Sequence, residues 1–192
     1  MKALRKGSRR RKLKVWVKCC LWLGVFAGMF VLGRIGLYAY FPKVYTDPVE
    51  QWSREYGVEE NFIYAVIHTE SNFRKDVVSV NDACGLMQIL PATFEWLQTK
   101  DAADETYVRE DLFTPEVNIR YGVLYLSILQ EQFGTLQATA AGYHAGMGAV
   151  ERWLQEEEYS SDGKILERIP YRDTARYVRK IEKTYQIYNW LY

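Results

Sequence analysis

The sequence has few of the residues that build disulfide frameworks and metal sites. It contains three cysteines and two histidines in 192 residues. Cys19 and Cys20 are adjacent, which leaves Cys84 alone in the remainder of the chain and excludes a bridge within that remainder. His68 and His144 do not have the spacing of zinc ligands. We therefore expect a domain that functions without disulfides, metal or cofactor.

Acidic residues are missing from the N-terminal region. Residues 1–43 hold eleven Lys or Arg and no acid, whereas residues 44–192 hold fourteen Lys or Arg against twenty-four Asp or Glu. The net charge of +1 conceals this division. A region with ten net negative charges lacks the basic face that nucleic acid requires, so we expect no nucleic-acid partner. A basic nucleic-acid tail in residues 1–18 is a weaker alternative.

One long apolar run follows the basic residues. Residues 19–41 are interrupted only by Arg34 and would span about 35 Å as a helix, enough for a bilayer core. We predict an uncleaved single-pass anchor in the cell membrane, with the basic tail 1–18 in the cytoplasm and residues 42–192 outside. The alternative is a signal peptide with its apolar region at 19–33, but no convincing small-residue cleavage site follows.

The remainder of the chain predicts a mainly helical domain. We expect a short linker at 42–48 and one domain at 49–192. Asp47 is expected to cap a first helix, with Pro48 at its first position. No internal repeat or pair of strands is evident, although residues 165–169 could be extended. Periodicity and turn signals predict helices over 48–56, 58–71, 91–97, 115–133, 136–143 and 150–157, and from 173 onward.

A glutamate lies on the apolar face of the second predicted helix. Phe62, Ile63, Val66 and Ile67 follow the helical period, and Glu70 falls on the same face near the C-terminal end. Desolvation and the negative end of the helix dipole both disfavour ionisation there and raise the pKa, as a general acid requires. The alternative is a structural glutamate satisfied by an arginine or a backbone donor.

Motifs spread over the domain resemble the soluble lytic transglycosylase family, whose goose-lysozyme-like domain cleaves bacterial peptidoglycan. The resemblance covers about residues 49–187 and depends on several elements in the family's order. These are Glu70-Ser71-Asn72-Phe73, Ser79, Gly85-Leu86-Met87-Gln88-Ile89-Leu90-Pro91-Ala92-Thr93, Leu112-Phe113 with Pro115 and Asn118-Ile119, residues 141–146, and Ile169-Pro170-Tyr171 with Thr174 and Tyr177-Val178.

The resemblance implies a mainly α, lysozyme-like fold and one catalytic acid. Glu70 would protonate the glycosidic oxygen between N-acetylmuramic acid and N-acetylglucosamine, and then accept a proton from the 6-hydroxyl that closes a 1,6-anhydro ring. Most glycosidases use two carboxylates. Asp76 and Asp82 are the nearest further acids, and neither occupies a position where the family has a catalytic group. Peptidoglycan strands and the membrane are the expected partners, and no protein partner is predicted.

The resemblance also implies a set of residues that bind the glycan, each with a structural alternative. For Ser79 the alternative is a capped loop, for Met87 it is core packing, and for Tyr143 it is a buried aromatic. Tyr177 has helical spacing that suits packing equally well, and Asn118 is expected to hold local structure. The predicted substrate-binding residues are Ser79, Met87, Gln88, Tyr143, His144 and Tyr177.

Three positions depart from the family's pattern. His144 replaces an asparagine and could introduce pH dependence, Asp82 replaces a glycine in a loop, and Asp173 replaces a glutamate. These departures leave the acid in place. A muramidase that uses water, and a wall-binding scaffold of an envelope-spanning machine that has lost turnover, remain alternatives.

Overall fold

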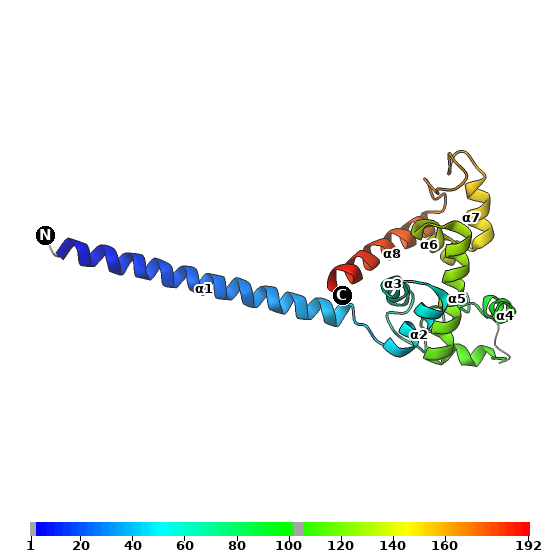
Figure 1. Cartoon of the computed structure of the whole chain (residues 1–192), viewed down its shortest axis with the longest axis horizontal. Coiled ribbons are helices and arrows are strands. Elements are labelled where there is room, and N and C mark those ends of the chain that lie inside the picture. The colour runs from blue at the N-terminus through cyan, green and yellow to red at the C-terminus, as the bar shows by residue number, and fades with distance from the viewer. Residues whose placement is uncertain (1–2, 102–105) are drawn as a thin grey trace. The chain divides into compact units, whose positions relative to one another are not determined.

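The computed structural model describes residues 3–101 and 106–192, which form two separate units. The first unit ends at Pro42 and consists mainly of one helix, α1 (Ala3–Tyr40), drawn in blue in Figure 1. Within it, Cys20–Tyr40 is long and apolar enough to cross a membrane by length and composition, with a mean hydropathy of 1.8. The predicted anchor is therefore helical, and the basic segment before it continues the same helix from Ala3 onward.

The second unit, Lys43–Tyr192, is mainly helical over its described residues, with loops between the helices. Within residues 43–101 and 106–192, β-pairing is limited to isolated bridges that join Val78 to Cys84 and Cys84 to Ile89, so residues 165–169 form no strand. Its elements are α2 (Thr46–Tyr56), α3 (Glu60–Glu70), α4 (Pro91–Gln98), the short 3-10 helix η1 (Arg109–Phe113), α5 (Pro115–Phe133), α6 (Leu136–Ala145), α7 (Met147–Leu154) and α8 (Arg172–Leu191).

Helix α3 forms the centre of this unit. Its residues 62–68 are all buried, because α8 packs along one side of it and α2 along another (Figure 1). Helix α5 packs against α2, α4 and α6, and α6 in turn packs against α7 and α8. The C-terminal end of α3, which carries Glu70, therefore lies within a frame of helices.

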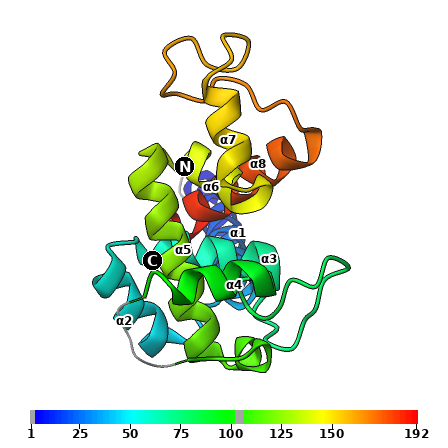
Figure 2. The same cartoon turned by 90° about the vertical axis from the view of Figure 1, so that its right-hand side faces the viewer.

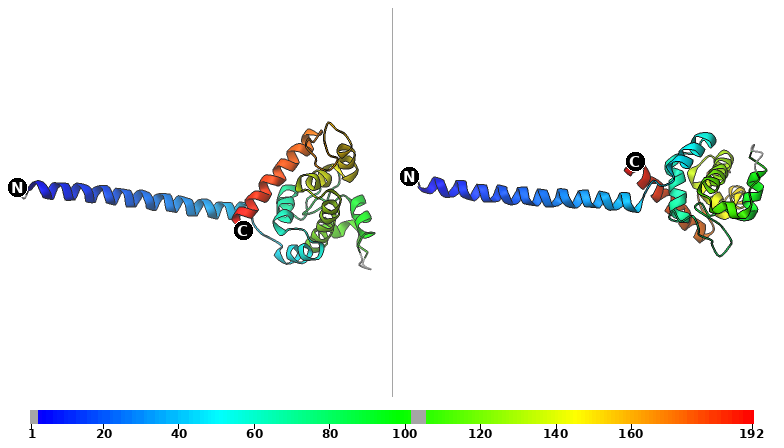
Figure 3. Two further views of the ribbon diagram at one scale, coloured as in Figure 1. Left: turned by 45° about the horizontal axis from the view of Figure 1, so that its top comes forward. Right: turned by 90° about the horizontal axis from the view of Figure 1, so that it is seen from below.

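Two long loops extend from the frame. Figure 2 shows them as the green loop at the right, after α3, and the orange loop at the top, between α7 and α8. Figure 3 shows α8 running along the edge of the unit to the C-terminus. The first loop returns to α4 through the Gly85–Gln88 segment, and a hydrogen bond from Ser71 to Leu86 holds this segment beside the end of α3.

The predicted helices are confirmed, with shifts of up to three residues at their boundaries; the largest is at α7, predicted at 150–157 and found at Met147–Leu154. The helix predicted at 48–56 begins at Thr46, so Asp47 lies in its first turn and does not cap it; Tyr45, with a φ of 59°, precedes the helix instead. Helix α2 thus starts within the segment predicted as the linker 42–48, and the compact unit begins at Lys43.

Candidate active site

A cleft of about 420 Å³ opens beside the C-terminal end of α3. Its walls come from α3, α4, α5 and α6, from the loop residues at 79–90 and from Gly146. The residues that line it are Glu70, Ser79, Asn81, Ala83, Gln88, Ile89, Leu90, Thr93, Tyr125, Tyr143, His144, Ala145 and Gly146. Glu70 is the single acidic side chain among these lining residues, so the cleft presents one carboxylate to a ligand.

Glu70 is poised between its protonated and ionised forms. Burial raises the pKa of its carboxyl from 4.5 to about 7, against the opposing effects of a hydrogen bond from Tyr177 and the positive charge of Lys180. The Tyr177 hydroxyl donates to Glu70 Oε1 over 2.6 Å. Lys180 donates to the Thr69 carbonyl over 3.0 Å, so its ammonium is fixed on the chain next to Glu70. At neutral pH this carboxyl can therefore both give and accept a proton.

The position of Glu70 follows from the apolar face of α3. Ile63, Val66 and Ile67, on the same face, are each 1% exposed or less. The neighbouring Ser71 is buried as well, and its hydroxyl donates to the Leu86 carbonyl over 2.7 Å. That bond ties the end of α3 to the Gly85–Gln88 segment, so the helix end cannot move away from the cleft without exposing a buried polar group.

Two tyrosines on different helices, Tyr143 of α6 and Tyr177 of α8, make hydrogen bonds beside the cleft. Tyr143 of α6 donates its hydroxyl proton to the Met87 carbonyl over 2.7 Å, and its ring lies 5.2 Å from that of Tyr125. Burial raises the pKa of both Tyr143 and Tyr177 well above 10, so both hydroxyls keep their protons. Tyr177 of α8 is the tyrosine that bonds Glu70, a role that helical spacing alone could not separate from core packing.

His144 lies between the cleft and Tyr177. Its Nδ1 is 3.2 Å from the hydroxyl of the buried Thr174, and its ring centroid is 4.5 Å from that of Tyr177. Partial burial of the ring lowers the pKa of His144, against the raising effect of Asp173. The histidine at the departure from the family pattern is thus in contact with the tyrosine that holds the acid.

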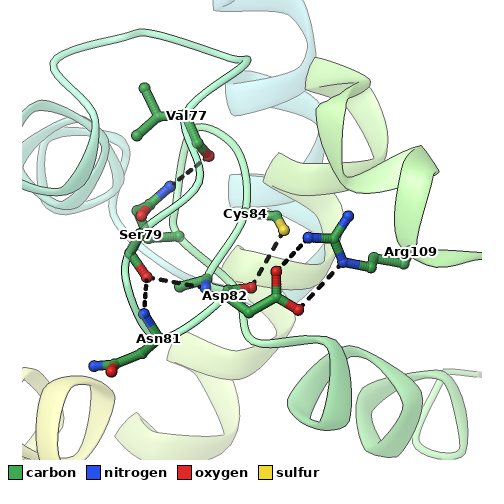
Figure 4. A network of polar contacts seen from close by, with 8 residues as sticks. Val77, Ser79, Asn81, Asp82, Cys84 and Arg109 are labelled. Atoms are coloured by element: carbon green, nitrogen blue, oxygen red, sulfur yellow. Dashed lines mark hydrogen bonds and ion pairs between the residues drawn. The ribbon is translucent and has the colours of Figure 1, made fainter.

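The loop around Ser79 forms one rim of the cleft. Figure 4 shows the polar contacts that hold this loop. The Ser79 hydroxyl oxygen accepts from the backbone N–H groups of Asn81 and Ala83 at 3.2 and 3.0 Å, which is the loop-capping arrangement considered as its alternative role. Its hydroxyl proton remains available for a further bond. Asp82 has a φ of 65°, a conformation that glycine adopts freely, and pairs with Arg109 of η1. The replaced glycine therefore sits where the backbone favours one.

Gln88 lines the cleft, and hydrogen bonds fix the orientation of its side-chain amide. Its Nε2 donates to the carbonyls of Val77 at 3.0 Å and Gly85 at 2.9 Å, and its φ is 51°. Both amide protons are thus engaged, which leaves the oxygen Oε1 as the group that can meet a ligand.

Met87, one of the predicted glycan-binding residues, is not among the residues that line the cleft. Its side chain is 0% exposed and packs against Gly122 of α5, which has no side chain to exclude it. Asn118 has the structural role expected of it. Its Oδ1 accepts from the Met87 N–H at 2.8 Å, and its Nδ2 donates to the carbonyls of Cys84 and Leu112 at 3.0 and 2.8 Å.

The other acidic residues near the motif lie outside the cleft, and some residues that line the cleft were not predicted from the sequence. Asp76 and Asp82 are exposed and do not line it. Within residues 3–101 and 106–192, no group of three His, Cys, Asp or Glu side chains could hold a metal ion. Tyr125 lines the cleft although no motif pointed to it, because its position in α5 looks like ordinary helical spacing. Thr93 of α4 also lines the cleft; it belongs to the Gly85–Thr93 motif but was not predicted as a binding residue.

Comparison with known proteins decides which family has this site. Residues 47–166 match the profile of the Transglycosylase SLT domain. The chain belongs to this family. It is 32% identical over 143 residues to the soluble lytic murein transglycosylase of Salmonella typhimurium, covering 73% of this chain and 22% of that one. It is also 32% identical over 173 residues to membrane-bound lytic murein transglycosylase C of Edwardsiella ictaluri, covering 75% and 46%.

Solved structures of SLT-domain proteins have the same fold. An inactive glutamate-to-glutamine variant of the lytic transglycosylase Slt from Pseudomonas aeruginosa aligns with a TM-score of 0.69 and 31% identity, over 80% of this chain and 25% of that one. The 70-kDa soluble lytic transglycosylase from Escherichia coli aligns with a TM-score of 0.73 and 27% identity, with the same coverage. The chain therefore has the lysozyme-like fold of this family, and it spans 22% to 46% of the length of the relatives named above.

Proposed function

We propose that this chain is a membrane-anchored lytic transglycosylase that cleaves the β-1,4 bond between N-acetylmuramic acid and N-acetylglucosamine in peptidoglycan. The observation that carries the proposal is Glu70, the single carboxylate lining the cleft, with its pKa raised by burial to about 7. Membership of the SLT-domain family and the names of its relatives support the substrate class.

In the proposed reaction Glu70 acts first as an acid and then as a base. It protonates the glycosidic oxygen as the bond from that oxygen to the anomeric carbon breaks. The 6-hydroxyl oxygen of the muramic acid forms a bond to the same carbon, and its proton passes to the Glu70 carboxylate. The enzyme regains its starting state and no water is consumed. A pKa near 7 suits both steps, because neither protonation state is strongly favoured at neutral pH.

Tyr177 holds the carboxylate during this cycle. Its hydroxyl donates to Oε1, so we assign proton transfer to the other oxygen, Oε2. The bond strengthens when Glu70 becomes negative, because hydrogen bonds to charged acceptors are stronger than neutral ones. With a single carboxylate in the cleft, the N-acetyl group of the substrate is proposed to stabilise the positive charge at the anomeric carbon.

We propose four further residues as glycan contacts. Ser79 offers a hydroxyl proton, Gln88 an acceptor oxygen, and His144 a ring nitrogen at the cleft surface. Tyr143 lines the same space with its ring, while its hydroxyl is held by the Met87 carbonyl. In this proposal Tyr177 does not contact the glycan; it is a positioning residue that orients the carboxylate of Glu70.

The proposed membrane arrangement has a cytoplasmic tail at 1–18, an anchor at 19–41 and a catalytic domain outside the cell. The apolar stretch Cys20–Tyr40 and the relatives named as membrane-bound support an anchor. The excess of Lys and Arg before this stretch favours a cytoplasmic N-terminus by the positive-inside tendency. Recovery of the chain in washed membranes with an intact N-terminus is expected; a mature N-terminus beyond Phe41 would identify a cleaved signal.

Product analysis separates the proposed reaction from its two alternatives. Purified peptidoglycan is digested with the wild type and with Glu70→Gln, and the fragments are examined by mass spectrometry. We expect 1,6-anhydro-muramic ends from the wild type and no turnover by the variant. Reducing muramic ends would identify a muramidase, and binding without turnover by the wild type would identify a scaffold.

A further inference from the structure

Exposed aromatic and aliphatic side chains occur at the first and last residues of the unit Lys43–Tyr192. Trp190 is 63% exposed and Tyr192 is 49% exposed, at the C-terminal end of α8. Val44, next to the first residue of the unit, is 40% exposed. Exposed tryptophan and tyrosine on a water-soluble surface often mark an interaction site when they are grouped.

Lys43 joins these two segments of the chain. Its ammonium lies 4.9 Å from the ring centroid of Tyr192 and 5.0 Å from that of Tyr64, and 3.7 Å from Glu60 Oε2. The start of the unit is therefore fixed against the last turn of α8 and the first turn of α3. We call Lys43 and Val44 at the start of the unit, together with Trp190 and Tyr192 at the end of α8, the junction patch. Trp190 and Tyr192 are two residues apart, so their rings project from different sides of the helix end.

Covalent linkage limits how far Lys43, a residue of the junction patch, can lie from the end of the apolar helix. Helix α1 ends at Tyr40, and Phe41 and Pro42 are the residues between it and Lys43. Three successive Cα–Cα steps of about 3.8 Å allow a separation of about 11 Å at most. The polar headgroup layer on each side of a bilayer has a thickness of about 5–8 Å. A helix that crosses the membrane and ends at Tyr40 therefore leaves Lys43 at or just beyond this layer.

We propose that the junction patch docks on the headgroup layer of the membrane that α1 crosses, with Trp190 and Tyr192 at the boundary of the acyl region. This rests on the membrane anchor in the proposed function. Trp and Tyr are the residues enriched at membrane–water interfaces, and lysine places its stem along such a boundary with its charge in water. The catalytic part of the chain has ten net negative charges, so the docking depends on aromatic insertion and not on attraction to anionic lipid.

Docking at this patch would set the height of the active site. Tyr177, which bonds Glu70, and Leu191 lie in the same helix α8. Their separation of fourteen residues corresponds to about 21 Å along the helix axis. The cleft would then be held within a few nanometres of the lipid surface, and glycan strands close to the membrane would be its substrates.

Spin-label accessibility in the full chain tests the docking. Cys19 and Cys20 are replaced by serine, buried Cys84 is retained, and the protein is placed in nanodiscs of zwitterionic phosphatidylcholine. Single labels are introduced by Trp190→Cys and by Tyr192→Cys, each of which keeps the other aromatic residue. Phe30→Cys, within the apolar helix, and Glu157→Cys, on the exposed loop after α7, are the matched controls.

The expected result is a severalfold lower collision rate with a water-soluble nickel chelate for the labels at 190 and 192 than for the label at 157. The label at 30 should be the most protected. If 190 and 192 are as accessible as 157 while 30 is protected, the anchor stands and the docking is overturned. If 30 is accessible as well, the anchor and the docking both fail. Product analysis on the same samples reports separately on the enzymatic proposal.

Discussion

The bond from Tyr177 to Glu70 gives the most specific prediction about catalysis. Tyr177→Phe removes the hydroxyl that donates to Glu70 Oε1 over 2.6 Å and keeps the ring that contacts His144. The lost bond favours the carboxylate, so its removal raises the pKa of Glu70 above its present value of about 7. A hydrogen bond to a charged group contributes about 1.5–3 kcal/mol, which corresponds to about one to two pKa units.

The assay is the pH dependence of kcat/KM on soluble glycan fragments. Glu70 must be protonated to act as an acid, so activity falls as pH rises through its pKa. In the wild type about a tenth of Glu70 is protonated one unit above that pKa, and in Tyr177→Phe we expect about half or more. The basic limb of the profile therefore moves upward by about one to two pH units.

Tyr125→Phe is the matched control. It removes a hydroxyl from another tyrosine of the cleft, one that donates to the Gly142 carbonyl at 3.4 Å and makes no bond to Glu70. Its basic limb should stay at the wild-type position. The reasoning is refuted if Tyr177→Phe lowers the maximum rate while its basic limb also stays there, because Tyr177 would then act through packing alone.

Four further predictions concern stability and are measured by urea denaturation. Glu70 has a pKa near 4.5 unfolded and about 7 folded, so its contribution to stability is lost as pH rises through this window; Glu70→Gln should be more stable than the wild type by up to about 3 kcal/mol near pH 8 and equal to it near pH 4. Gly85→Ala should destabilise by about 3 kcal/mol or more, since φ is 78° and a Cβ would overlap the Asn118 amide. Met87→Ala should lose about 2–5 kcal/mol as a cavity mutation, whereas a role on the cleft surface would leave stability nearly unchanged. Asp82→Gly should change stability by less than about 1 kcal/mol, because it loses an exposed ion pair and keeps the turn, and Asp82→Val should cost more.

The position of the acid could be predicted from the sequence because it depends on helical periodicity. Phe62, Ile63, Val66 and Ile67 define the buried face of α3, and Glu70 must follow them into it. The same local rule predicted most helix boundaries. It failed at the start of α2, where Tyr45 has a left-handed backbone conformation that no capping motif in the sequence predicts. It also placed α7 three residues too late at both ends.

Contacts between distant segments could not be predicted in this way. Met87 is buried because Gly122, thirty-five residues later, leaves space for its side chain. Tyr177 bonds Glu70 across 107 residues of sequence, and its helical spacing is the same whether it packs or positions an acid. Family resemblance pointed to both residues, but only the packing of α5 and α8 separates a structural role from a functional one.

The fate of solvent oxygen tests the central claim most directly. Peptidoglycan is digested by the wild type in water enriched in heavy oxygen, and the masses of the newly formed muramic ends are measured by mass spectrometry. The account predicts anhydro ends without the label, because the 6-hydroxyl of the substrate supplies the attacking oxygen and Glu70 only moves protons. Incorporation of one heavy oxygen at each new muramic end would contradict it and show that water is the nucleophile.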